Sequence, residues 1–129
     1  FPYTTLFRSW NLNSDRPIFI QIVERIEMDI ISGKYKPGDK LPSVRDFAAE
    51  AAVNPNTMQK AFTELERTGL VFSQRTTGRF ITEDTSMIDE LKSTLAKDKI
   101  TELLSFMQQL GFQENEILAM IGQTMKGEK

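Results

Sequence analysis

The sequence predicts a mainly α-helical, α+β protein: an N-terminal winged helix-turn-helix with a short C-terminal two-helix dimerisation tail. Two short helices with start signals follow one another within residues 41–69. A hairpin pattern with Gly near its tip and two Arg follows at 70–82. Broadly apolar helical segments then fill 85–129. We therefore predict a DNA-binding domain at 10–84 and a helical dimerisation region at 85–129.

The first nine residues, FPYTTLFRS, look foreign to the rest of the chain. Residues 2–9 can be encoded by CCC TAC ACG ACG CTC TTC CGA TCT, which matches a common sequencing-library adapter. We expect segment 1–9 to be adapter-derived and non-native, and exclude it from fold reasoning. The alternative is a genuine apolar N-terminal arm.

Composition excludes several classes of function. The 129 residues contain no Cys and no His, which removes disulfides, thiolate chemistry, the commonest general base and the commonest metal ligand. We therefore expect no enzyme activity, no metal and no cofactor. No apolar run is long enough for a membrane span and no secretory signal is visible, so a cytoplasmic location is expected by default.

The charge is unevenly distributed along the chain. The net charge is −2, which is acidic for a protein that binds nucleic acid. However, residues 34–82 carry eight Lys or Arg and five Asp or Glu, whereas residues 85–129 carry five Lys and seven acids. The basic excess therefore coincides with the predicted helix-turn-helix and wing.

The first helix is predicted over residues 17–32. Apolar residues recur at 18, 22, 26 and 30, with 19, 23 and 31 beside them, which is the period of a helix. Pro17 suits its first turn and Gly33 its end. A turn at 36–39 then leads to the second helix, which Ser43 opens with a capping pattern completed by Asp46.

The third helix is predicted to begin at Asn54 and Pro55, an N-cap followed by the first helical position, and to end at Gly69. Its apolar stripe, one helical face wide, consists of Met58, Ala61, Phe62 and Leu65. The opposite face carries polar and basic side chains that can contact base edges and phosphates: Asn56, Lys60, Thr63 and Arg67.

Two short strands, 70–73 and 79–82, are predicted to form the wing around Gly78. The tail is predicted to contain helices at 87–110 and 114–125. The apolar positions of the first tail helix exceed one ordinary stripe, and in the second we expect Ile117, Leu118, Ile121 and Met125 to face inward.

The stretch from residue 16 to 83 resembles the GntR family of bacterial transcriptional regulators. The matching segments are PIFIQIVERIEMDIISGKYKPGDKLPS, PSVRDFA and VNPNTMQKAFTELERTGLVFSQRTTGRFI. The short two-helix tail is similar to the YtrA-like subfamily, whose members are homodimeric repressors. Pro55 and Gln59 stand where many members have Arg, so the wider family's operator sequence is not carried over.

The resemblance and the residue pattern together give the predicted DNA contacts. Arg45 near the start of the second helix is assigned to phosphate, since helix N-termini favour anions. The third helix and the wing supply the remaining contacts: Asn56, Thr57, Gln59, Lys60, Thr63, Arg75, Thr77, Gly78 and Arg79. The predicted dimer interface comprises Leu95, Ile100, Leu103, Leu104, Phe106, Met107, Leu110, Ile117, Leu118 and Ile121.

These residues predict a homodimeric repressor that binds a double-stranded, pseudo-palindromic DNA operator. The main alternative is a winged helix that contacts another protein and not DNA, in which the polar helix face is merely solvated. Phe106 and Phe112 could instead line a ligand pocket, and the tail could simply close its own core. No membrane partner is predicted, and a small-molecule effector is neither implied nor excluded.

Overall fold

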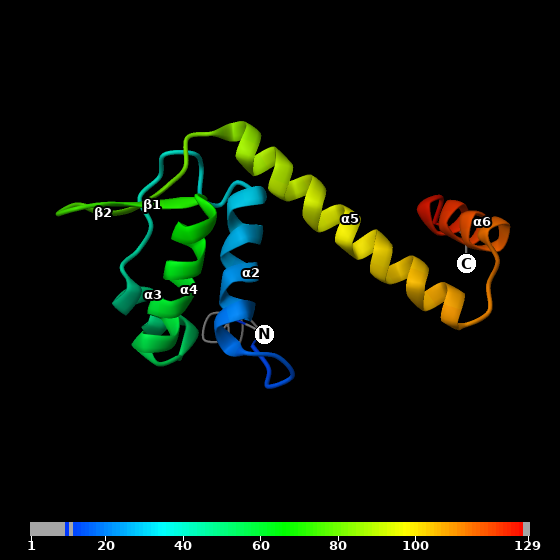
Figure 1. Cartoon of the computed structure of the whole chain (residues 1–129), viewed down its shortest axis with the longest axis horizontal. Coiled ribbons are helices and arrows are strands. Elements are labelled where there is room, and N and C mark those ends of the chain that lie inside the picture. The colour runs from blue at the N-terminus through cyan, green and yellow to red at the C-terminus, as the bar shows by residue number, and fades with distance from the viewer. Residues whose placement is uncertain (1–9, 11, 128–129) are drawn as a thin grey trace. The chain divides into compact units, whose positions relative to one another are not determined.

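The structure, a computed structural model, describes residue 10 and residues 12–127. Its elements are α2 (Ile18–Ile31), α3 (Val44–Ala51), α4 (Pro55–Thr68), β1 (Val71–Gln74), β2 (Gly78–Ile81), α5 (Thr85–Gln109) and α6 (Glu114–Met125) (Figure 1). The chain divides into two units, one ending at Asp89 and the other beginning at Glu90, inside α5. The prediction for residues 1–9 lies outside the described residues.

In the first unit, α2, α3 and α4 surround one apolar core. Helices α2 and α4 run side by side in Figure 1. The predicted stripe of α4 is fully buried, with Met58, Ala61, Phe62 and Leu65 each 0% exposed. Phe47 of α3 meets Phe62 edge-on, with the ring centroids 5.6 Å apart. Burial of each large apolar side chain contributes about 1.5–3 kcal/mol to folding, so this face fixes how α4 is turned.

Local capping sets the boundaries of the helix-turn-helix. The Ser43 hydroxyl accepts a hydrogen bond from the backbone N–H of Asp46 at 3.0 Å, and the Asn54 side chain accepts one from Asn56 N–H at 2.7 Å. Pro55 is the first residue of α4. Ala52, with φ of 58°, ends α3 in the left-handed conformation and turns the chain toward α4. The predicted N-caps at Ser43 and Asn54 are therefore confirmed.

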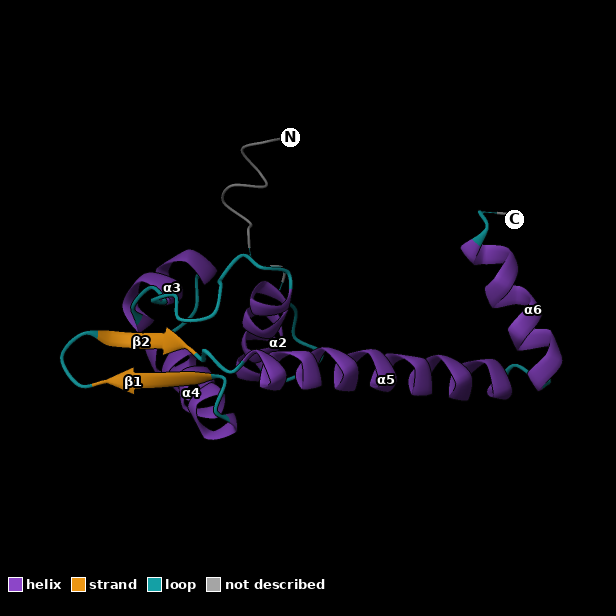
Figure 2. Cartoon of the chain, turned by 90° about the horizontal axis from the view of Figure 1, so that it is seen from above, coloured by secondary structure: helices purple, strands orange, loops and turns teal. Residues whose placement is uncertain are grey.

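The wing is an antiparallel hairpin in which Val71 pairs with Ile81, Ser73 with Arg79 and Gln74 with Gly78 (Figure 2). Each strand is offset by one residue from its predicted position. The chain before α3 adds a further edge to β2, through hydrogen bonds from Leu41 N–H to Arg79 O and from Ile81 N–H to Asp39 O. Strand β2 is therefore hydrogen-bonded through its backbone along both of its edges.

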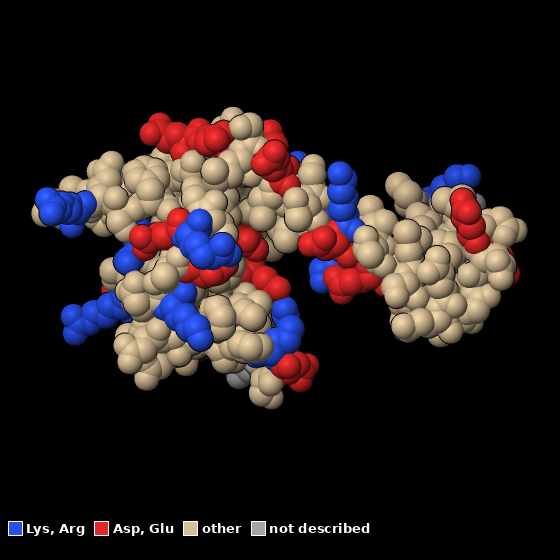
Figure 3. Space-filling model, viewed as in Figure 1, with Lys and Arg blue, Asp and Glu red and all other residues tan. Residues whose placement is uncertain are grey.

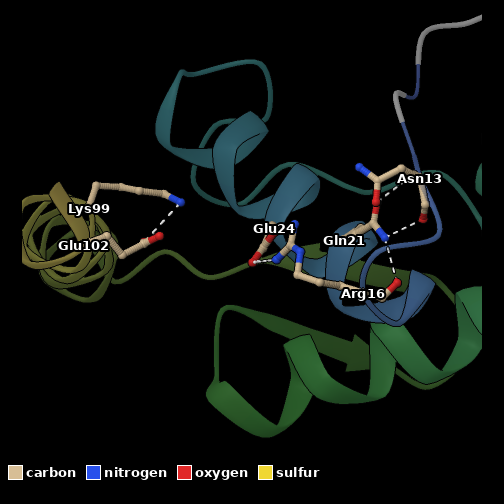
Figure 4. Close-up of polar contacts among 6 residues, drawn as sticks. All are labelled: Asn13, Arg16, Gln21, Glu24, Lys99 and Glu102. Carbon is tan, nitrogen blue, oxygen red and sulfur yellow. Dashed lines mark hydrogen bonds and ion pairs between the residues drawn. The ribbon is translucent and has the colours of Figure 1, made fainter. Parts of the chain in front are cut away.

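A loop before α2 closes one end of the core. Trp10 is 8% exposed, packs edge-on against Phe47, and donates from Nε1 to the Glu50 carboxylate at 2.7 Å. Gln21 is buried and donates to the carbonyls of Asn13 and Arg16, both at 2.8 Å, while its Oε1 accepts from Asn13 N–H (Figure 4). Burial of an amide is tolerated here because these bonds satisfy it.

In the second unit, α5 leads through a turn at Gly111 into α6, which begins at its predicted residue. Met107 and Ile117 are the described residues of this unit that are buried, at 8% and 3% exposure. The prediction that Leu118 and Met125 face inward is wrong for the single chain, in which they are 63% and 83% exposed. A pair of helices has only one mutual contact face, so much of the apolar surface of α6 lies outside it.

Candidate nucleic-acid interface

The outward face of α4 is exposed and polar. Asn56, Gln59, Lys60, Thr63 and Arg67 are all exposed, on the side opposite the buried stripe. This separation follows from the helical period, since residues three and four apart lie on one side of the helix. The helix therefore presents amide, hydroxyl and basic groups to solvent along one face.

A groove of about 850 Å³ lies beside this face, between the start of α3, helix α4 and the wing. The predicted contacts that line it are Arg45, Gln59, Thr77, Gly78 and Arg79. Three elements that are separate in sequence thus bring their predicted side chains to one concave surface. Among the described residues that line the groove, Asp46 is the one acidic residue.

Lys40 lines the same groove and was not predicted from the sequence. A Cβ at Gly78 would lie 3.0 Å from Lys40 Cε, which places the lysine side chain against the start of β2. Gly78 also has φ of 117°, a conformation that other residues rarely adopt. Lys40 belongs to no periodic pattern in the sequence. Its place in the groove follows from the pairing of its segment with β2.

The other predicted contacts lie outside the residues that line this groove: Asn56, Thr57, Lys60, Thr63 and Arg75. The Lys60 ammonium is 4.2 Å from the centroid of the Phe19 ring of α2, a cation–π contact. The Thr63 hydroxyl donates to the Gln59 carbonyl at 2.9 Å. Arg75 is exposed in the turn of the wing.

Two arginines near the wing have acidic partners on α4. Arg67 forms a hydrogen-bonded ion pair with Glu64, which lowers the pKa of that carboxyl through the hydrogen bond and the charge of Arg67. Arg79 Nε is 2.6 Å from Glu66 Oε1, and its guanidinium lies 5.1 Å from the centroid of the Phe62 ring. Arg79, placed among the DNA contacts by the sequence, is thus already engaged within the fold.

Positive side chains occur at the end of the wing and over α3 and α4 in the space-filling view (Figure 3). Among the described residues, Arg45 and Arg75 take part in no ion pair. They are therefore available to anionic partners. No group of three or more acidic side chains in the described part of the chain is arranged to hold a metal ion.

The second unit exposes a large part of its predicted interface. The side chains of Ile100, Leu103, Leu104, Phe106, Leu110 and Leu118 are between 37% and 63% exposed. Leu95 and Ile121 are half-buried, and Met107 and Ile117 are buried. Phe106, at 56% exposure, is not enclosed as a pocket-lining residue would be. None of the described helices is long and apolar enough to cross a membrane.

A helix-turn-helix with a wing and a basic, polar outward helix defines a class of DNA-binding proteins. Comparison with known sequences gives the family. The profile described as "Bacterial regulatory proteins, gntR family" matches residues 20–81. The HTH-type regulator YhcF of Bacillus subtilis is 40% identical over 105 residues, covering 81% of this chain and 87% of that protein. The B. subtilis repressor YtrA is 40% identical over 97 residues, covering 75% and 70%. The chain belongs to the GntR family of bacterial transcriptional regulators.

Solved structures agree with this assignment. A GntR-family regulator from Listeria monocytogenes superposes with a TM-score of 0.82 at 38% identity, covering 87% of this chain and 98% of that one. The DNA-binding domain of AraR, solved in complex with operator ORX1, has a TM-score of 0.51 at 28% identity and covers 57% and 90%. The protein is thus a DNA-binding transcriptional regulator and not an enzyme. The resemblance seen in the sequence is confirmed.

Proposed function

We propose that the protein is a homodimeric repressor that binds a pseudo-palindromic operator. The observation that carries the proposal is the groove in which Arg45, Gln59 and the wing residues meet beside the outward face of α4. A recognition helix beside a wing is suited to DNA, because the helix fits the major groove while the wing reaches the adjacent backbone.

In this proposal α4 enters the major groove. Asn56, Gln59 and Thr63 are exposed amide and hydroxyl side chains of the kind that read base edges. Thr57 and Lys60 flank them. Arg45 binds phosphate at the start of α3, where free backbone N–H groups add to the attraction. The wing residues Arg75, Thr77, Gly78 and Arg79 approach the neighbouring minor groove or backbone.

The second unit supports a dimer. It exposes several large apolar side chains on both α5 and α6. A single exposed apolar residue needs no explanation, but many on one pair of helices are typical of an interface. We assign the interface to Leu95, Ile100, Leu103, Leu104, Phe106, Met107, Leu110, Ile117, Leu118 and Ile121. Two-fold symmetry of the protein then implies two-fold symmetry of the operator.

Repression follows if the bound dimer covers a promoter, and the relative YtrA, of which this chain covers 70%, is described as a repressor. A regulator of this family acts on the chromosome, and we place it in the cytoplasm.

The test is selection of duplexes from a random DNA pool by the full chain, with the oligomeric state measured by sedimentation. We expect a dimer and an enriched site with two inverted half-sites about 34–36 Å apart. Failure to enrich any sequence, together with binding that does not respond to salt, would instead favour a winged helix used for protein contact.

A further inference from the structure

We propose that Glu66 and Arg79 form a positioning pair that fixes the wing on the recognition helix, so that both bind DNA as one rigid unit. This inference rests on the docking proposed above. Glu66 is acidic and is not among the predicted DNA contacts, and the proposal gives it a role in DNA binding. The proposal also makes Arg79 a positioning residue in place of a phosphate contact.

The Glu66 carboxylate connects α4 to both strands of the wing. Its Oε1 accepts from Arg79 Nε at 2.6 Å, and its Oε2 accepts from the Ser73 hydroxyl at 2.9 Å. Ser73 and Arg79 are directly opposite one another in the β1–β2 register. One carboxylate therefore joins the middle of each strand to the C-terminal half of α4.

The carboxylate is well satisfied as an anion. Partial burial alone would raise the pKa of Glu66, but hydrogen bonds from Arg79 and Ser73 and the charge of Arg79 outweigh it, and the pKa is lowered. Charge-assisted hydrogen bonds are shorter and stronger than neutral ones. The link is therefore ionised and intact at the pH of a living cell.

The other side of Arg79 is also engaged. Its guanidinium lies over the ring of Phe62, which is 0% exposed and belongs to the α4 core stripe. Arg79 is thus held between a core aromatic ring and a carboxylate, with its side chain 25% exposed. A planar guanidinium suits this arrangement because it can stack and donate at once.

The position of this link matters because it ties the strands to α4, whereas the backbone hydrogen bonds of β2 join it to β1 and to the segment 38–41. Asp39 and Leu41 bond to the backbone of Ile81 and Arg79, whereas among the described residues the turn at 75–77 is hydrogen-bonded to Gln74, through the Thr77 N–H and hydroxyl. The Glu66 link engages the Ser73–Arg79 pair, one residue pair before the turn. It therefore sets the distance between the wing and the outward face of α4, which are two walls of the groove.

Removal of Glu66 distinguishes positioning from simple electrostatics, because the two predict opposite signs. Electrostatics alone predicts that Glu66→Gln binds DNA more tightly, since an acid near phosphates is lost. The positioning pair predicts binding that is about three- to tenfold weaker, the typical effect of one net hydrogen-bonded contact. The matched control is Glu64→Gln, which removes the same charge from the same helix but touches Arg67 and not the wing.

The assay is the affinity of the full chain for a duplex that the wild-type protein has selected from a random pool, measured across salt concentrations. We expect Glu66→Gln and Arg79→Lys to weaken binding without changing the salt slope, and Glu64→Gln to bind equally or more tightly. Tighter or unchanged binding of Glu66→Gln would overturn the proposal. A shallower salt slope for Arg79→Ala but not for Arg79→Lys, with Arg79→Lys binding at full strength, would make Arg79 a direct phosphate contact and also overturn it.

Hydrogen exchange in the absence of DNA tests the link separately. We expect faster exchange of the wing amides at 72–80 in Glu66→Gln but not in Glu64→Gln, with unchanged exchange in the α4 core. Equal wing exchange in both variants contradicts the proposal. If the wild-type protein selects no DNA, the proposed function fails, while the exchange result still decides whether Glu66 fixes the wing.

Discussion

Replacement of Arg45 by Ala tests the proposed phosphate contact most directly. Arg45 is the second residue of α3, is exposed, lines the groove and takes part in no ion pair among the described residues. Ala is a strong helix former, and removal of a cation from a helix N-terminus does not destabilise it. The variant should therefore fold as the wild-type protein does, which circular dichroism and thermal melting check.

The magnitude follows from the number of cations that face the DNA. Lys40, Arg45, Lys60 and Arg75 are exposed on α3, α4, the wing and the segment beside it. A dimer presents two copies of each of these cations, and each cation is taken to neutralise one phosphate. At about −0.9 per phosphate neutralised, log affinity should fall against log salt concentration with a slope of about −7. Arg45→Ala removes two contacts and should bring the slope to about −5. Each exposed contact contributes about 1 kcal/mol, so loss of two contacts should lower the affinity at moderate salt about 30-fold.

The assay is fluorescence anisotropy of a labelled selected duplex over a series of salt concentrations. Arg45→Lys keeps the charge and should keep the slope, although it loses the bidentate geometry of the guanidinium. Lys97→Ala, which removes an exposed cation from α5, serves as the control for net charge and should leave binding unchanged. An Arg45→Ala slope equal to that of the wild type would refute the assignment of Arg45 to phosphate.

Three further predictions concern the dimer, the core and pH. Leu103→Asp should give a monomer in sedimentation, since a carboxylate would be buried in the proposed interface, while Thr101→Asp on the same helix stays dimeric; a dimeric Leu103→Asp protein means that the interface lies elsewhere. Trp10→Ala should lower the free energy of unfolding by about 3–5 kcal/mol, because it removes a buried ring and the bond to Glu50; chemical denaturation measures this, and a loss below about 1 kcal/mol contradicts it. The pKa of Glu27 is raised, first by burial and then by Glu24 and Glu64, so its ionised form costs stability at neutral pH. Glu27→Gln should therefore raise the melting temperature at pH 7, and the gain should vanish as pH falls below the ordinary Glu value of 4.5; a gain that persists in acid would point to another cause.

The helices could be predicted closely because each has a local signal. Asn54, Pro55 and Gly69 bound α4, and the period of Met58 and Phe62 identifies its buried side, so the sequence alone determines which side chains face outward. The predicted strands were each shifted by one residue, because the turn chemistry at 74–78 specifies a hairpin more firmly than it specifies the register.

Contacts between distant segments could not be predicted. Trp10 packs on Phe47 across a long sequence separation, and Lys40 reaches the groove only because its segment pairs with β2. Likewise, nothing periodic relates Glu66 to Arg79, which are thirteen residues apart on different elements. Leu118 was expected to face inward because a helical wheel identifies an apolar side but not what covers it.

The ion pairs of α4 also explain how a chain of net charge −2 can carry a DNA-binding surface. The two acids of α4, Glu64 and Glu66, are each paired with an arginine. Pairing removes their repulsion toward phosphates, but it also engages Arg67 and Arg79, so the count of basic residues overstates the charge that DNA meets. The loss of these two arginines as DNA contacts is partly offset, because the Glu66–Arg79 pair holds the wing in place. Binding therefore depends less on total charge than on a few exposed cations held at fixed positions beside a helix whose two acids are already paired.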